Sequence, residues 1–155
     1  MSIVYFLRTC SDLVKLAQQY SIRFTGVMIE NYEDDTQSTP VRQPDTQQFR
    51  YYGSLLLQQG GEVGFHGYNH QPLVLPDTDY KDLYSYRQWP SEDAIVAAMN
   101  ELIDFQKTVL PNTEGSVYVP PSNILSAAGR KVLGSKVSQI RTIASTYFSD
   151  GTSLP

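Results

Sequence analysis

The alternation of two kinds of segment constrains the fold of this chain more than any other feature. From Arg23 onward, short apolar runs of strand length alternate with longer segments whose apolar residues recur every three or four positions. Strands that alternate with amphipathic helices are typical of a mainly parallel sheet covered by helices. In such folds, ligands bind at the carboxyl ends of the strands. We therefore predict an α/β domain whose functional residues directly follow its strands in the sequence.

Turn and cap residues separate the predicted elements. We expect strands at residues 23–29, 62–65, 116–119 and 139–145. We expect helices from residue 3 to about Tyr20, from Pro44-Asp45 to Gly60-Gly61, from Pro90 to about Leu110, and from Asn123 to Leu133, where Gly134 stops the last one. At the N-terminus, a strand over residues 3–7 followed by a shorter helix capped at Ser11-Asp12 is the alternative. The polar stretch ENYEDDTQSTPVRQPD after the first strand has the composition of a loop.

Length and composition define the class of protein. With 155 residues, 41% of them hydrophobic, the chain can bury the core of one domain but not of two. Its net charge of -4 and its lack of a basic run argue against nucleic acid as a partner. The single cysteine, Cys10, cannot form an internal disulfide. The apolar run at residues 3–7 is too short for a membrane span and lacks the basic flank of a signal peptide.

The only two histidines, His66 and His70, stand in the segment HGYNH, directly after a predicted strand. Because Gly67 weakens a helix, a turn that leaves the strand is the more natural conformation than a helix with both rings on one face. In either conformation two imidazoles can converge on one divalent metal ion, for which zinc is the expected element. The alternative is that His66 hydrogen-bonds to backbone while His70 lies in a solvated loop.

The residues around these histidines resemble a known family. GGEVGFHGYNHQPL is similar to the second signature of polysaccharide deacetylases (the NodB-homology domain), in which a strand leads into His-(Ser/Thr)-x-x-His. QQYSIRFTGVMI is similar to the family's segment of a helix followed by a turn and an Ala-Thr-Phe-Phe strand, and VYVPPSN is similar to its third signature, Phe-Arg-Pro-Pro-(Tyr/Phe)-Gly. IRTIASTYFSDG falls where the fourth signature is expected. The resemblance covers nearly the whole chain from about Leu13.

This resemblance implies a partial or distorted (β/α) barrel in which the histidine pair and one aspartate hold a divalent metal. It implies hydrolysis of the N-acetyl groups of a carbohydrate polymer, with a second aspartate as base and a late histidine as acid. From the third-signature segment we expect Tyr118, Pro120 and Pro121 to contact the sugar. Trp89, in the aromatic run YKDLYSYRQW, is a further candidate for a sugar contact, although such a run can equally anchor a long connection to the core.

Several departures from the family pattern bear on the activity. The Thr-Phe-Asp-Asp and Leu-x-x-His signatures are absent, Val119 replaces an arginine, and Gly67 replaces a serine or threonine. The chain is therefore either a piece of a larger enzyme or a degenerate relative, and we expect a single domain over residues 1–155 that is incomplete at both ends. The leading hypothesis is a metal-dependent deacetylase-type hydrolase. The alternative is a catalytically silent carbohydrate-binding or interaction domain with the same fold.

Two further questions stay open at the level of sequence. A third metal ligand from within the chain could come from Glu30, Glu33, Asp34 or Asp35, which follow the first predicted strand. We favour the alternative that these acidic residues form a solvated loop, because charge clusters usually lie on the surface. The family resemblance suggests extracellular or cell-envelope substrates, whereas the chain shows no export signal.

Overall fold

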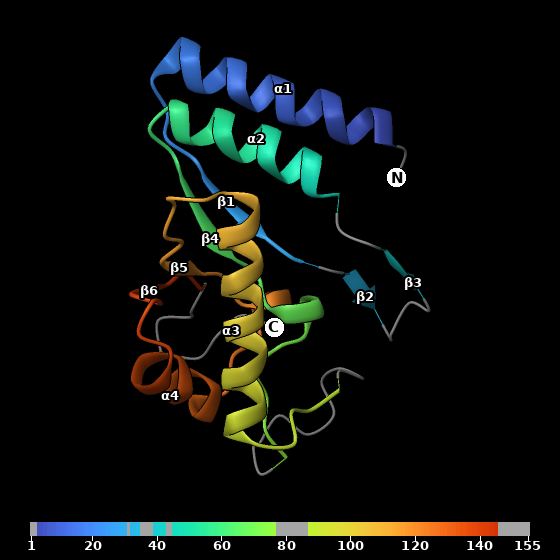
Figure 1. Cartoon of the computed structure of the whole chain (residues 1–155), viewed down its shortest axis with the longest axis vertical. Coiled ribbons are helices and arrows are strands. Elements are labelled where there is room, and N and C mark those ends of the chain that lie inside the picture. The colour runs from blue at the N-terminus through green and yellow to red at the C-terminus, as the bar shows by residue number, and fades with distance from the viewer. Residues whose placement is uncertain (1–2, 31, 35–38, 43–44, 77–86, 146–155) are drawn as a thin grey trace.

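Four strands form one all-parallel sheet in the order β1-β4-β5-β6 (Figure 1). The computed structural model describes residues 3–30, 32–34, 39–42, 45–76 and 87–145, and it describes side chains from Ser11 onward outside residues 32–34 and 39–42. The strands are β1 (Thr25–Met28), β4 (Glu62–Phe65), β5 (Val117–Tyr118) and β6 (Thr142–Ile143). Each strand lies beside the next parallel strand of the chain, as in an arc of a (β/α) barrel. The predicted α/β class with mainly parallel strands is confirmed.

One helix, α1 (Ile3–Tyr20), precedes the sheet in the chain, and α2 (Thr46–Gln58), α3 (Glu92–Val109) and α4 (Ala127–Lys136) lie between its successive parallel strands. Three of them begin at a side-chain cap, in which Asp45, Ser91 or Ser126 accepts a hydrogen bond from a backbone N–H of the first turn. Figure 1 shows α1 and α2 side by side at one end of the molecule and α3 running across the sheet. Among the helices that the structure describes, none has the length and apolar character needed to cross a bilayer.

The core lies between the sheet and the helices α2, α3 and α4. Met28, Phe65 and Tyr118 face this side from three neighbouring strands and are 4%, 0% and 0% exposed. They pack against two groups of buried helix residues, which include Ile95, Met99, Leu102, Val132 and Leu133 in one and Val109 and Leu110 in the other. On the opposite face of β1, Thr25 and Val27 are exposed. Because side chains alternate along a strand, the helices cover one face of β1.

The register of the sheet aligns the carboxyl ends of the strands. Met28 pairs with Phe65, Phe65 with Tyr118, and Tyr118 with Ile143. The ladder continues one residue further after β4, β5 and β6, because the N–H of the residue that follows each of these strands donates to the last residue of the preceding strand, for example His66 to Met28 at 2.9 Å. Residues that follow the strands are thereby brought to one edge of the sheet, as the sequence predicts.

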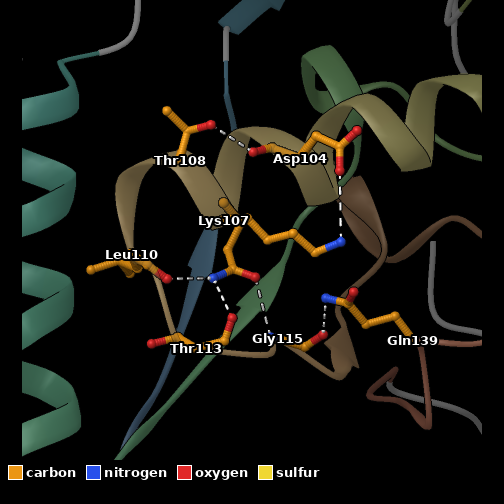
Figure 2. Close-up of polar contacts among 8 residues, drawn as sticks. Asp104, Lys107, Thr108, Leu110, Thr113, Gly115 and Gln139 are labelled. Carbon is orange, nitrogen blue, oxygen red and sulfur yellow. Dashed lines mark hydrogen bonds and ion pairs between the residues drawn. The ribbon is translucent and has the colours of Figure 1, made fainter.

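A buried glutamine fixes the connection between α3 and β5. Gln106 is 0% exposed, and its Nε2 donates to the carbonyl oxygens of Leu110 and Thr113 at 3.2 and 2.8 Å. Its Oε1 accepts the N–H of Gly115 at 3.3 Å, and Gln139 donates to the carbonyl of Gly115 at 2.9 Å (Figure 2). Because every polar atom of this side chain is bonded, its burial is compatible with a stable core.

The predicted elements differ from the structure in three places. Residues 30–45 contain a two-stranded antiparallel hairpin, β2 (Tyr32–Asp34) and β3 (Thr39–Arg42), where we expected a loop. The predicted strand 139–145 is reduced to Thr142–Ile143, because residues 137–140 form a turn closed by the N–H of Ile140 on Val137. At the N-terminus, by contrast, the expected helix to Tyr20 is confirmed, and the alternative of a short strand there is wrong.

The helix predicted from Asn123 begins later and ends later. Ser122 and Asn123 lie in the left-handed region of backbone conformation and form the short turn η2 (Pro121–Asn123), which a helix cannot continue. Ser126 then caps α4, which runs past Gly134 to Lys136. Gly134 does not stop the helix, since a glycine in the interior of an exposed helical turn weakens it without breaking it.

Candidate functional site

His66 stands where β4 ends and is held by two neighbouring strands. Its backbone N–H donates to Met28 at the end of β1, at 2.9 Å. Its ring Nδ1 lies 2.8 Å from the carbonyl oxygen of Val119, which follows β5. Because a carbonyl oxygen can only accept, Nδ1 carries the hydrogen, and in the neutral ring Nε2 is the nitrogen with a lone pair to offer. The half-buried ring is therefore fixed in both orientation and tautomer.

A tight turn brings His70 back toward His66. Gly67 has a φ of 78° and precedes the short turn η1 (Tyr68–His70), in which Asn69 and His70 also have positive φ, 54° and 56°. The segment is thus a turn that leaves the strand, as predicted, and not a regular helix. Gly67 also packs closely on Pro121, since an added Cβ would lie 2.5 Å from its Cγ. The turn therefore requires glycine at position 67, where the deacetylase signature has serine or threonine.

The two imidazole rings lie next to each other. Their centres are 5.0 Å apart and their planes are inclined by 61°. Two imidazoles bound to one tetrahedral zinc ion, with zinc–nitrogen distances of about 2.0–2.1 Å, would have ring centres roughly 5 Å apart. The spacing of the pair therefore fits two ligands of one metal ion.

Glu30 lies beside the histidine turn as a buried carboxylate. It is 7% exposed, two residues beyond the end of β1, and its Oε1 accepts the N–H of Asn69 at 2.7 Å. The expectation of a solvated acidic loop is wrong for this residue, because a carboxylate that accepts a backbone N–H at the sheet edge can be buried. The structure does not describe Asp35 or the side chains of Glu33 and Asp34.

The described residues do not supply a complete protein ligand set. Within them, no group of three or more His, Cys, Asp or Glu side chains is arranged to hold a metal ion. Of the candidate ligands that the sequence suggests, the structure brings together His66 and His70. A hydrolytic zinc site usually has three protein ligands, so the pair provides part of such a site.

Tyr68, which the sequence analysis did not single out, anchors the turn to α3. Its hydroxyl donates to Glu101 at 2.9 Å, and its ring lies edge-on to Trp89 with centres 6.4 Å apart. Burial, the hydrogen bond to Glu101, and the negative charges of Glu101 and Glu30 raise the pKa of Tyr68 to about 12. The phenol is consequently a stable hydrogen-bond donor at neutral pH. The sequence around Tyr68 does not predict this anchoring role, because the hydrogen-bond partner, Glu101, lies on α3, far away in the sequence.

A second strained turn lies beside the first. Ser122 and Asn123, after β5, have φ of 50° and 58°, and Asn123 Oδ1 accepts the hydroxyl of Ser145 at 2.8 Å. Four of the six non-glycine residues with positive φ in the described chain belong to η1 and η2. Such conformations carry strain and cluster at functional sites. Their position marks the carboxyl ends of β4 and β5 as the site edge.

The residues expected to contact sugar occupy different places. Tyr118 is 0% exposed within the core, and Pro120 and Pro121 are buried behind the histidine turn. Trp89 is half-buried, and its indole N–H donates to the carbonyl of Pro72 at 3.1 Å, which ties the connection before α3 to the core. The tyrosines of the run before Trp89 lie outside the described residues. Contact of these residues with a carbohydrate stays a prediction.

One family model matches almost the whole chain. The model described as "Uncharacterised protein conserved in bacteria (DUF2194)" covers residues 8–154. The chain belongs to the DUF2194 family. No curated protein matches the DUF2194 chain.

Solved structures share the fold of the DUF2194 chain at low identity. BA3943, a CE4 family pseudoenzyme from Bacillus anthracis, is 13% identical with a TM-score of 0.54, over 88% of this chain and 38% of that one. A mutant of it, described as having restored enzymatic activity, gives the same TM-score. The Xyl-CE4 domain of a multidomain xylanase, from the hindgut metagenome of Trinervitermes trinervoides, is 16% identical with a TM-score of 0.55, over 92% of this chain and 54% of that one.

These comparisons confirm the predicted resemblance at the level of the fold. The CE4 family comprises polysaccharide deacetylases, and the parallel sheet of the DUF2194 chain matches theirs. The chain spans about two fifths to a half of the length of these structures. At this low sequence identity, the comparisons show that the DUF2194 chain shares the fold of these structures. Its chemistry has to be inferred from the residues at its own site.

Proposed function

We propose that this chain is a deacetylase-like domain that binds a divalent metal ion, of which Zn²⁺ is the best suited, through His66 and His70. The observation that carries the proposal is the hydrogen bond from His66 Nδ1–H to the carbonyl of Val119. Metal-binding histidines commonly donate their second ring nitrogen to a carbonyl or carboxylate, which fixes the tautomer that can bind. The neighbouring ring of His70, 5.0 Å away between centres, supports a shared ion.

We propose further that the domain acts on N-acetylated carbohydrate polymers. The support is the fold shared with CE4 structures, one of which is a domain of a xylanase. A bound divalent ion would supply Lewis acidity toward an acetyl carbonyl and activate water for attack. The chain's own residues would hold the site: Val119 sets the tautomer of His66, and Tyr68 fixes the turn through Glu101. The described residues provide two ligands, so a third would be water or a group outside them.

Metal binding tests the first step of this proposal. The purified chain is titrated with Zn²⁺ and Co²⁺, and its metal content is measured by elemental analysis, beside a His66→Ala, His70→Ala double variant. Stoichiometric binding that the double variant loses is the expected result. A Cys10→Ser variant is the matched control, because it removes the only thiol and should leave binding unchanged. Equal binding by the wild type and the double variant would refute the proposed site.

A second candidate function is a catalytically silent carbohydrate-binding domain. The observation that favours it is the lack of a three-ligand group among the described residues, and BA3943, which shares the fold, is itself described as a pseudoenzyme. The two functions differ in product. Release of acetate from an N-acetylated polymer by the metal-loaded chain, lost in the histidine double variant, supports the hydrolase. Saturable polymer binding with no acetate released supports the silent domain.

A further inference from the structure

We infer that Glu30 is a positioning residue that holds the histidine turn in its metal-binding shape without itself binding the ion. This inference rests on the proposed metal site at His66 and His70. It assigns a role to the buried carboxylate that the sequence analysis grouped with a solvated loop.

The end of β1 contacts the histidine turn at two points. The carbonyl of Met28 accepts the N–H of His66 at 2.9 Å, and Glu30 Oε1 accepts the N–H of Asn69 at 2.7 Å. The two anchored amides belong to the first histidine and to the residue before the second one. A backbone held at both places has little freedom to separate His66 from His70.

The turn needs such an anchor because its backbone is strained. Asn69 and His70 both have positive φ, and non-glycine residues keep this conformation only where their surroundings impose it. The bond from Asn69 to Glu30 is short, at 2.7 Å, and the carboxylate that accepts it is buried. The strand β2, which follows Glu30 in the chain, also lies against η1. The carboxylate is thus placed to impose the conformation that turns His70 toward His66.

One carboxylate oxygen of Glu30 is engaged by the backbone of the histidine turn. Its Oε1 accepts a backbone N–H, and it does not form a three-ligand group with the histidines. A positioning role depends on an acceptor oxygen at this place, whereas a ligand role depends on the negative charge. Glutamine keeps the oxygen and removes the charge, so Glu30→Gln separates the two roles.

The experiment compares four forms of the chain: wild type, Glu30→Gln, Glu30→Ala and the control Glu62→Ala. Glu62 is a glutamate at the opposite end of the strands, where it accepts the hydroxyl of Thr25 at 2.7 Å. Co²⁺ affinity and the visible spectrum of the bound ion are measured for each form. In metal-free samples, hydrogen exchange of the Asn69 amide and the nuclear Overhauser effect between the two histidine rings are measured. The ring signals are simple to assign because the chain has two histidines.

We expect Glu30→Gln to keep the wild-type Co²⁺ spectrum and a Co²⁺ affinity within about threefold of the wild-type value. We expect Glu30→Ala to lower the Co²⁺ affinity by about tenfold or more, as substitution of residues that orient metal ligands usually does. We expect Glu30→Ala also to speed exchange of the Asn69 amide and to weaken the signal between the rings. Glu62→Ala should match the wild type in all four measurements. If Glu30→Ala does not fold, Glu30→Asp replaces it, because its carboxylate is one methylene short of Asn69.

Different outcomes refute the inference and the proposed function. If Glu30→Gln loses as much affinity as Glu30→Ala, the charge matters and the positioning role is wrong. If Glu30→Ala behaves as the wild type, Glu30 has no role at the site. If the wild type binds no cobalt, the metal proposal fails, while the exchange and ring measurements still decide whether Glu30 holds the turn.

Discussion

The ring Nδ1 of His66, which follows β4, lies 2.8 Å from the backbone carbonyl oxygen of Val119, which follows the adjacent strand β5. The deacetylase signature has an arginine where this chain has Val119, so the side chain differs. The contact nevertheless uses the main-chain carbonyl, which any residue provides. The orientation of His66 therefore does not depend on which side chain stands at position 119.

Gly67 provides the sharpest test of the turn. Replacing it with serine restores the residue type of the deacetylase signature, yet we expect Gly67→Ser to destabilise the fold by about 1–3 kcal/mol, through its positive φ and the contact with Pro121. Urea unfolding measures the change, and cobalt affinity should fall with it. Gly134→Ala is the control, because nothing lies within 4 Å of its added Cβ and alanine favours a helix by about 0.5–1 kcal/mol. A stable Gly67→Ser protein with unchanged metal affinity would contradict this account.

The sequence predicts the sheet and the approach of the two histidines well, because both follow from local pattern. Strand periodicity and the parallel class place His66 at a carboxyl edge, and Gly67 predicts a turn. What it cannot predict are contacts made across the fold. The bond from Glu30 to Asn69 joins residues 39 positions apart, and the one from Tyr68 to Glu101 joins residues 33 apart. No spacing in the sequence signals such pairs.

Local pattern also failed where backbone conformation overrides propensity. The fourth predicted helix begins late because Ser122 and Asn123 adopt left-handed conformations, which are uncommon for serine and which asparagine adopts more readily than most residues. The hairpin β2–β3 was missed because its two strands are short and polar, so they show none of the apolar alternation that marks a strand.

The ion pair that Lys136 of α4 forms with the start of α3 predicts how the stability of the fold depends on pH. Lys136 lies 2.9 Å from Glu92 and 3.4 Å from Asp93. The hydrogen bond and the charge of Lys136 hold the pKa of Glu92 below its ordinary value. A lowered folded pKa gives stability that is present at neutral pH and is lost as pH falls through that pKa. We expect Lys136→Met to lower the melting temperature slightly at neutral pH and to match the wild type in acid.

Thermal unfolding followed by circular dichroism from neutral pH to pH 3 checks this prediction. The effect should also shrink with added salt, because the pair is at the surface. Lys107→Met is a suitable control, since Lys107 pairs with Asp104 within one helix, at 3.6 Å, and connects no second element. A difference between Lys136→Met and wild type that persists unchanged in acid would show that packing and not charge is responsible.

Gln106 should be important for the stability of the fold and should have no effect on metal affinity. Gln106→Leu removes a buried side chain that bonds the backbone at Leu110, Thr113 and Gly115 (Figure 2). Leaving buried backbone groups unpaired costs about 1–3 kcal/mol for each, so we expect a loss of at least about 2 kcal/mol in urea unfolding. Gln139→Ala, which removes one bond to Gly115, should lose less. Wild-type stability of Gln106→Leu would refute the role of this network.

A Tyr118→Phe variant tests whether Tyr118 packs in the core or contacts a sugar. Its hydroxyl is buried and has no hydrogen-bond partner within the described part of the chain, and burial raises the pKa of the phenol far above its ordinary value. Because an unbonded buried hydroxyl is unfavourable, Tyr118→Phe should leave stability unchanged or raise it by up to about 1 kcal/mol. If Tyr118 only fills the core, the same variant should bind carbohydrate polymers as the wild type does. A clear loss of polymer binding with unchanged stability would instead place this hydroxyl in contact with the sugar, which would require the core around Phe65 to open.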